Sequence, residues 1–481
     1  MKPPVVEAEA ADIGVMNESR LSRPAGPGAS RIPISPGVVV ASLAVVTLYV
    51  VVTMLLIART PYETWSVMLM GPTLIVVSLP LLARQSAREG DRSLFWFLIL
   101  ALLVKFLGTA ARLVVEIDLY DRVADPIGYH REGAEFAEQF RAGDFDTGLS
   151  SLVGHEFIWV FTGALYTVIG TSQVAGSLFY SWLAFLGLFL FYRAFLVAVP
   201  EGRARSYARL LFFLPTMVFW SSGIGKDAWM VFSLGVACYG VARVLSGSLW
   251  PGTLYVGLGL WLAAIVRPHV AAIVAVSLAA AYVVRRSRPG LKQLGPVIKG
   301  ISIVGVVLLA LAVSARAERF LHRSGIDLDS GLASALEQSA ERTTEFGGGS
   351  TFVPSVVRSP ARLPIAGVTV LFRPLLFDAH NWQAGLVAVE GTVLLLLSLF
   401  RWRWALGALR SVRRQPYVAF AFTYTILFVV AFSSIANFGL LVRQRVQVLP
   451  LFLLFLVVPP PTRAEPAETR RSRDAVHESS R

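Results

Sequence analysis

A carboxylate beside a predicted surface helix is the first candidate for chemistry. It opens the segment Asp125-Pro-Ile-Gly-Tyr-His-Arg-Glu-Gly, which predicts a short helix from Tyr129 to Phe140. In one interpretation Asp125 caps this helix, and the remaining residues form a solvated amphipathic face. In the other, its carboxylate acts as a general base toward an acceptor hydroxyl. Tyr129 and His130 would then contact the substrate.

A polar turn between two apolar segments is the second candidate. It runs from Trp220 through two serines and two glycines to Lys226 and Asp227. Helix capping beside an interfacial tryptophan accounts for such a pattern. Alternatively, backbone N–H groups of the turn and the Lys226 ammonium group would bind a phosphate. The glycine spacing is too short for a Walker A loop.

Ionisable residues in or beside apolar segments form a third group. Arg267 and His269 flank a proline at a turn, and Lys105 and Arg112 lie on one face of a predicted helix. Because charges next to a membrane core are costly, function is the default hypothesis for them. Arg112 can reach the interface. Lys105 lies near the middle of its helix, so we expect its partner on another helix.

The C-terminal half supplies further cations. Arg358 and Arg373 precede His380. Arg373 would bind a phosphate bidentately and His380 would transfer a proton near neutral pH, although interfacial anchoring also explains them. Arg443 and Arg445 lie near the start of the last apolar segment, where charge-based topology predicts no arginine. Their position therefore indicates an anionic ligand.

The composition indicates that membrane-embedded helices position these residues. Of 481 residues, 55% are hydrophobic and 16% are charged, and the mean hydropathy is +0.62; soluble domains carry about 25% charged residues. We therefore predict an all-α polytopic membrane protein with about twelve transmembrane helices. The predicted spans are 37–58, 66–83, 94–114, 175–198, 209–224, 227–246, 252–267, 269–285, 300–315, 384–400, 416–434 and 439–458.

Basic clusters set the predicted orientation, because cytoplasmic loops carry the excess of Lys and Arg. Placing them all inside puts both termini in the cytoplasm. Phe157–Gly170 and Leu363–Phe377 would invert this topology if they crossed, so we predict re-entrant or membrane-surface helices there. The net charge of +13 is then mainly a topology signal, with attraction to anionic lipid second. Nucleic acid is not an expected partner.

The predicted domain organisation is a transmembrane domain, 37–458, between disordered cytoplasmic tails, 1–36 and 459–481. Its long loops, 115–174 and 316–383, lie on the extracytoplasmic side, as do nearly all candidate residues. The first loop is acidic and offers carboxylates to a divalent metal ion, but their spacing follows no ligand signature, so no metal ligand is assigned. The single cysteine, Cys238, excludes a disulfide framework. The sequence shows no internal repeat of the kind found in many secondary transporters.

Several of these motifs together resemble the GT-C class of polytopic glycosyltransferases. More narrowly, residues 94–400 resemble bacterial surface-polysaccharide proteins that include Wzy-like oligosaccharide-repeat-unit polymerases. The matching segments are Asp125-x3-Tyr129-His130-x2-Gly133, Phe219-Trp220-Ser-Ser-Gly-Ile-Gly225-Lys226-Asp227-Ala228-Trp229, Arg267-Pro268-His269, Phe346-Gly-Gly-Gly-Ser350-Thr-Phe352 and Leu371-Phe372-Arg373-Pro374. The resemblance implies a GT-C-like fold and a polyprenyl-phosphate- or pyrophosphate-linked sugar donor at the outer face of the bacterial inner membrane.

The expected function is a membrane glycosyltransferase or polymerase in exopolysaccharide or lipopolysaccharide synthesis. Asp125 or His380 would take the proton of the acceptor hydroxyl. The leaving phosphate would be held by Lys226, Arg267, His269 and Arg373. Membrane lipids, polyprenyl-linked oligosaccharide and other assembly proteins would be its partners. Two alternatives stay open at this point: a lipid-linked oligosaccharide flippase or other transporter, and a subunit of an assembly complex without chemistry.

Overall fold

The computed structural model describes residues 36–119, 125–200, 202–285, 351–379 and 382–459, with isolated residues between 300 and 340. In these ranges the regular structure is helical, apart from one isolated β-bridge between Thr351 and Asn437. The prediction of an all-α protein is confirmed for this part of the chain. His380, segment 341–350, most of the span predicted at 300–315 and nearly all of both predicted tails lie outside the described residues.

The chain divides into two compact units, Met1–Thr60 and Pro61–Arg481. In the first unit, helix α1 (Pro36–Arg59) is the described element. Most of its described apolar side chains are exposed. A helix that is apolar on all sides and leaves this surface uncovered is typical of a segment surrounded by lipid.

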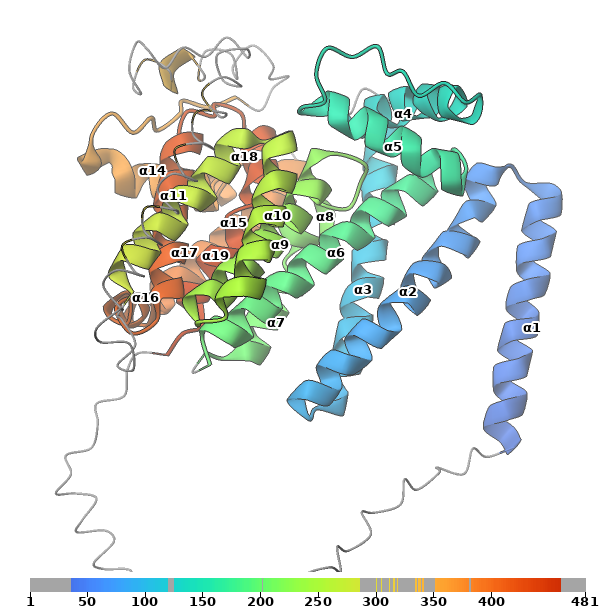
Figure 1. Cartoon of the computed structure of the whole chain (residues 1–481), viewed down its shortest axis with the longest axis horizontal. Coiled ribbons are helices and arrows are strands. Elements are labelled where there is room, and N and C mark those ends of the chain that lie inside the picture. Colours follow the sequence, from blue (N-terminus) through green and yellow to red (C-terminus); the bar gives the residue numbers. More distant parts are fainter. Residues whose placement is uncertain are drawn as a thin grey trace, which may run out of the picture. The chain divides into compact units, whose positions relative to one another are not determined.

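The second unit is a set of packed helices (Figure 1). Its α-helices are α2 (Tyr62–Glu89), α3 (Arg92–Val114), α4 (Asp125–Arg141), α5 (His155–Ile169), α6 (Gln173–Ala198), α7 (Ala204–Phe213), α8 (Pro215–Phe219), α9 (Lys226–Leu245), α10 (Leu249–Val266), α11 (Pro268–Val284), α14 (Leu363–Phe372), α15 (Trp382–Phe400), α16 (Trp402–Arg410), α17 (Pro416–Phe432), α18 (Phe438–Arg445) and α19 (Leu449–Phe452). Short helical turns are η1 (Val115–Leu119), η3 (Pro360–Arg362), η4 (Leu376–Asp378) and η5 (Leu453–Leu456).

Among the described residues, five helices are long and apolar enough to cross a membrane. They are α2, α3 with its π-helical extension to Asp118, α6, α9 and α10. Counting each of two bent pairs, α15 with α16 and α18 with α19 and η5, as one span raises the number to seven. The chain therefore has the helices of a membrane-embedded protein. The count of twelve spans stays a prediction.

Two predicted spans are not continuous helices. The span predicted at 209–224 breaks between α7 and α8 at Leu214, whose backbone is extended. The break is explained by Pro215, since a proline disfavours helical geometry in the residue before it. The span predicted at 439–458 bends by 58° between α18 and α19, and Pro450 lies in the first turn of α19. Both corrections follow from prolines that the hydropathy pattern does not register.

The core of the second unit is built around α6, α9 and α10, which pack along much of their length. Gly187 of α6 and Gly235 of α9 face each other so closely that a Cβ added to Gly235 would lie 2.3 Å from the Gly187 carbonyl oxygen. Small residues at such crossings let helix backbones approach, which is how membrane helices gain packing contacts without a hydrophobic driving force.

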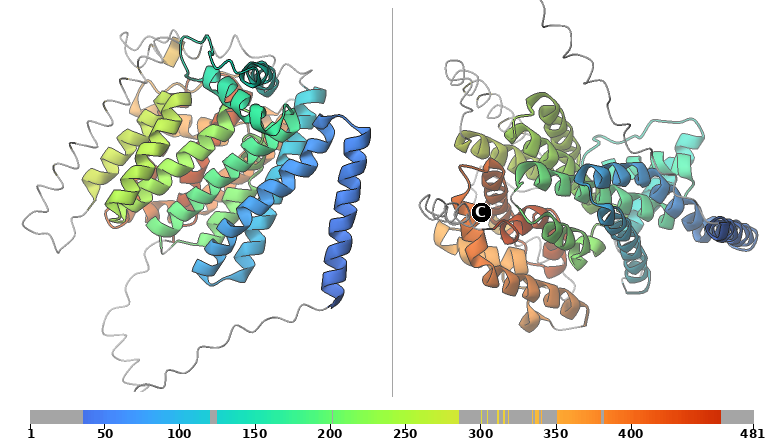
Figure 2. Two further views of the ribbon diagram at one scale, coloured as in Figure 1. Left: turned by 45° about the vertical axis from the view of Figure 1, so that its right-hand side comes forward. Right: turned by 90° about the horizontal axis from the view of Figure 1, so that it is seen from below.

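Helices α4 and α5 pack side by side, and both figures show them at the end of the unit where α6 begins (Figures 1 and 2). Helix α5 matches the surface helix predicted at 157–170 within two residues. Helix α4 begins at Asp125, four residues earlier than predicted, because Pro126 is compatible with the first turn of a helix. At the second predicted surface helix, 363–377, the ten-residue α14 ends at Phe372 and is followed by η4.

Candidate functional site

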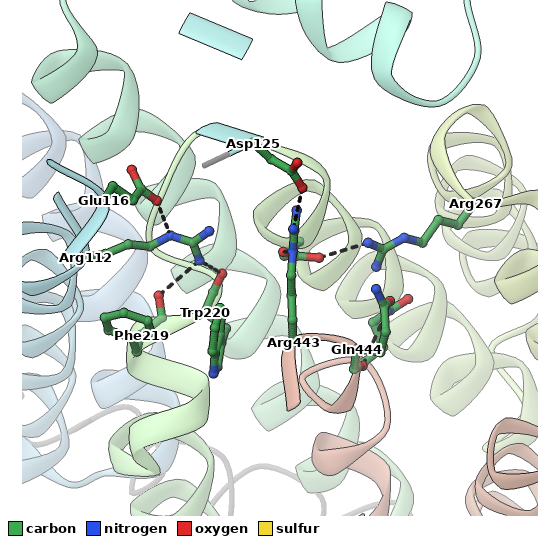
Figure 3. A network of polar contacts seen from close by, with 10 residues as sticks. Arg112, Glu116, Asp125, Phe219, Trp220, Arg267, Arg443 and Gln444 are labelled. Carbon is green, nitrogen blue, oxygen red and sulfur yellow. Dashed lines mark hydrogen bonds and ion pairs between the residues drawn. The ribbon is translucent and has the colours of Figure 1, made fainter. Parts of the chain in front are cut away.

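A group of charged side chains from distant parts of the chain meets at helix ends (Figure 3). Asp227, buried in the first turn of α9, accepts a hydrogen bond from Arg267 Nη2 at 3.0 Å and another from Arg443 Nε. Arg443 also donates through Nη1 to Asp125 of α4. We call these four residues and Lys226 the charge cluster. It joins α4, α9, α18 and the junction of α10 with α11.

Local sequence explains why each side chain stands at a helix end. Gly225 precedes α9 with a φ of 142°, a region that favours glycine, and so turns the chain into Lys226 and Asp227. Arg267 is the residue between α10 and α11, where Pro268 starts the second helix. Asn437 caps α18 by accepting a hydrogen bond from Leu440 N at 3.1 Å, which fixes the short helix that carries Arg443.

The cluster has unused capacity to bind an anion. Arg267 is 8% exposed, and its buried Nη1 has no hydrogen-bond partner among the described residues. Over the same ranges, no side chain or carbonyl accepts a hydrogen bond from the half-buried Lys226 ammonium group. The positive end of the α9 dipole lies beside it. Two cations without full partners next to a helix N-terminus suit a phosphate or carboxylate.

The two carboxylates of the cluster differ in exposure and therefore in what they can do. The Asp227 side chain is 4% exposed and lies between two guanidinium groups, so it holds the cations in place. The Asp125 side chain is 56% exposed and is bonded to Arg443 through Oδ2. Asp125 is thus the carboxylate of the cluster that an incoming hydroxyl group can reach.

Tyr129 and His130 connect α4 to its neighbours. A Cβ added to Gly225 would lie 2.9 Å from the Tyr129 ring, so this buried ring packs on the turn before Lys226. Burial, and then the charge of Asp125, raises the pKa of the Tyr129 phenol, which stays protonated. His130 Nδ1 lies 2.8 Å from the Tyr166 hydroxyl oxygen, and burial lowers the pKa of His130. Tyr129 therefore supports the turn, whereas His130 joins α4 to α5. Their contact with a substrate stays a prediction.

His155 is a site residue that the sequence reasoning did not single out. It lies near Lys226 at the first position of α5, where its side chain is exposed on one side and covered on the other. Its pKa is lowered by partial burial and then by the Lys226 charge. The sequence signal was a histidine at the start of a predicted surface helix, which carries little information without knowledge of the neighbouring turn.

Cations of α3 hold the segment that leads into the cluster. The buried Lys105 Nζ donates at 2.7 Å to the carbonyl oxygen of Met217 and at 2.7 Å to Ser221 Oγ. The predicted partner outside its own helix is confirmed. Arg112 donates to Glu116 Oε1 at 2.6 Å and to the carbonyl oxygen of Trp220 (Figure 3). Both cations thus satisfy carbonyl groups at the C-terminal end of α8.

Other predicted phosphate-binding residues lie in separate contacts. Arg373 forms a bidentate ion pair with Asp378, with distances of 2.6 and 3.0 Å, and its guanidinium group lies over the rings of Phe352 and Phe438. The buried Arg445 donates to the carbonyl oxygens of Val370 and Arg373. These contacts hold both side chains in the fold, and Arg445 Nη1 has no hydrogen-bond partner among the described residues. The anion-binding role of both arginines stays a prediction.

Of two more predicted binding residues, Arg358 lies in a separate ion pair, and His269 lies two residues from Arg267 of the charge cluster. Arg358 pairs with Glu337 at 2.8 Å, and both side chains are exposed. His269 is half-buried in the first turn of α11, and its ring centroid lies 6.1 Å from that of Phe432. Within the described ranges no three His, Cys, Asp or Glu side chains come together as metal ligands.

Comparisons of the chain with models of protein families, with curated proteins and with solved structures give no match.

Proposed function

We propose that this protein is a membrane glycosyltransferase or polymerase that takes sugars or oligosaccharide repeat units from a polyprenyl-phosphate or -pyrophosphate carrier. It would act at the extracytoplasmic face of the bacterial inner membrane in exopolysaccharide or lipopolysaccharide synthesis, with about twelve spans in a GT-C-like arrangement. The observation that carries the proposal is that the exposed Asp125 carboxylate pairs with Arg443 and lies near Lys226. Arg443 shares its second partner, Asp227, with Arg267.

In the proposed reaction the acceptor hydroxyl oxygen attacks the anomeric carbon of the carrier-linked sugar. The new glycosidic bond forms as the bond from that carbon to the phosphate oxygen breaks, and the leaving phosphate keeps the electron pair. Lys226 and Arg267 Nη1 stabilise the added negative charge. Asp125 receives the hydroxyl proton as general base. His380 remains the alternative base of the proposal.

The contacts of the other buried charges favour a transferase over a flippase. A transporter is expected to carry charged groups along a path through its helices. Lys105 of α3 and Glu390 of α15 are buried ionisable residues in apolar helices, and both bind the backbone of α8. Within the charge cluster, Lys226 and Arg267 keep free bonding capacity, and they lie together at helix ends. Outside it, the described residues with a buried, unbonded charged atom are Glu116, Glu390 and Arg445.

Complementation of a deletion strain tests the proposal. Wild type should restore surface polymer, whereas Asp125→Asn, expressed at the same level in the membrane, should not. Glu132→Gln, which alters another carboxylate of α4, is the matched control and should restore it. Carrier-linked units should accumulate on the outer leaflet; accumulation on the inner leaflet would instead indicate failed flipping. Full restoration of polymer by Asp125→Asn would overturn the assignment of the base.

A further inference from the structure

Helix α16 differs from the neighbouring apolar helices in length, direction and charge. It has nine residues and leaves α15 at an angle of 62°. At 1.5 Å per residue it is about 14 Å long, which is half of a bilayer core. It lies at the end of the second unit away from α4 and α18, and so away from the charge cluster (Figure 1).

The rest of the protein fixes the direction of α16. Arg401, at the bend, donates to the carbonyl oxygen of Leu456 at 2.7 Å. The Trp404 ring lies under the guanidinium group of Arg203 at 4.5 Å, and Gly407 and Ala408 are buried. One side of α16 is therefore anchored, and the bend is held by contacts with η5 and with the residue before α7.

The opposite side of α16 is exposed and combines apolar and cationic residues. Trp402 is 53% exposed and Leu406 is 41% exposed. The exposed arginines of α16 and the following turn are Arg403, Arg410, Arg413 and Arg414. In the described part of the chain none of them forms an ion pair. No Asp or Glu occurs between positions 401 and 415.

We propose that this face of α16 binds acidic phospholipids, with Trp402 and Leu406 in the acyl-chain boundary and the four arginines on the headgroup phosphates. Helices that lie in the membrane interface have this pattern of tryptophan, leucine and arginine. Unpaired arginines near an anionic lipid surface are stabilised, whereas a zwitterionic surface supplies no net charge to neutralise them. The lipid would lie in the leaflet opposite the charge cluster. The inference is independent of the proposed enzymatic function.

Lipid binding by the purified full-length protein tests the proposal. In nonionic detergent, native mass spectrometry would count bound phosphatidylglycerol against phosphatidylcholine. We expect wild type to prefer phosphatidylglycerol, and replacement of all four arginines by Gln to reduce its affinity about tenfold or more, consistent with several lost charge contacts. Replacement by Lys should retain most of the binding, because the charges remain.

A fluorescence-quenching measurement and a control variant test where the lipid binds. Phosphatidylglycerol with brominated acyl chains should quench less fluorescence in Trp402→Phe than in wild type, since this ring would lie at the chain boundary. Replacing Arg84, Arg88 and Arg92, exposed residues at the α2–α3 turn, by Gln should leave that quenching unchanged. Unaltered phosphatidylglycerol binding by the four-Gln variant, or equal binding of both lipids by wild type, would overturn the proposal.

Discussion

Arg267 and Asp227 form an ion pair 3.0 Å apart, and their side chains are only 10% and 4% exposed. Replacing Asp227 by Asn removes the negative charge from between Arg267 and Arg443. Removing one partner of a buried pair typically costs about 3–5 kcal/mol, because the remaining charge is left uncompensated. We expect Asp227→Asn to lower the midpoint of thermal unfolding in detergent by several degrees.

Cys238 supplies the measurement, because it is the single cysteine of the chain and is buried. Maleimide should label it only as the protein opens. Asp146→Asn, in an exposed loop, is the control and should leave the unfolding midpoint unchanged. The double variant Asp227→Asn/Arg267→Leu should lose less stability than the sum of the losses in the two single variants, since the two residues interact directly. Strictly additive effects would contradict the pairing.

A second prediction concerns the turn before Lys226. Gly225→Ala would place a Cβ 2.9 Å from the Tyr129 ring at a φ of 142°. Such backbone strain costs about 1–3 kcal/mol, and relieving it would move Lys226. Gly225→Ala should therefore reduce both thermal stability and polymer restoration. Gly128→Ala is the matched control, because an added Cβ there meets nothing within 4 Å. Equal stability and equal polymer restoration in the two variants would contradict the close packing of Gly225 on Tyr129.

The apolar runs predicted most of the fold, because membrane helices are specified by length and composition. The five helices long enough to span coincide with predicted spans. The pairing of Asp125 with Arg443 could not be predicted, because 318 residues separate them and no local pattern specifies the contact. Because no local pattern specifies such contacts, the sequence predicts anion binding for Arg373 and Arg445 as well as for Arg267. Only packing reveals that Asp378 pairs with Arg373 and that Arg445 Nε and Nη2 bind backbone carbonyls.

A third prediction concerns pH. Burial lowers the pKa of His130 below its ordinary value of 6.5, so the folded state binds fewer protons than the unfolded state as the pH falls through that region. The folded state is therefore not penalised by His130 above about pH 6.5, and its free energy of unfolding falls as the pH drops below that value. We expect wild type to lose more thermal stability between pH 7.5 and pH 5.5 than His130→Gln does. His155→Gln should change this difference less, because His155 is exposed.

The fourth prediction concerns α8, whose two ends are held by opposite charges from other helices. At its start Glu390 Oε2 accepts a hydrogen bond from Thr216 N at 2.7 Å, and at its end Lys105 binds the carbonyl oxygen of Met217. The negative charge of Glu390 and the positive charge of Lys105 match the helix dipole, which favours anions at the N-terminus and cations at the C-terminus. Each side chain also satisfies a backbone group that this five-residue helix cannot satisfy internally.

Lys105→Met should therefore destabilise the protein by about 1–3 kcal/mol. Ser221 Oγ would lose its donor, and the Met217 carbonyl oxygen would keep only the hydrogen bond from Ser221. Glu390→Gln keeps an acceptor oxygen for Thr216 N and should cost less than Glu390→Leu, which removes it. Labelling of Cys238 during a thermal ramp would rank the three variants by their unfolding midpoints. Because α8 leads through residues 220–225 into Lys226 and Asp227, hydrogen exchange of that turn should rise in Lys105→Met and Glu390→Leu, more than in Glu390→Gln. If exchange rises equally in all three, the hydrogen bonds to α8 do not position the turn.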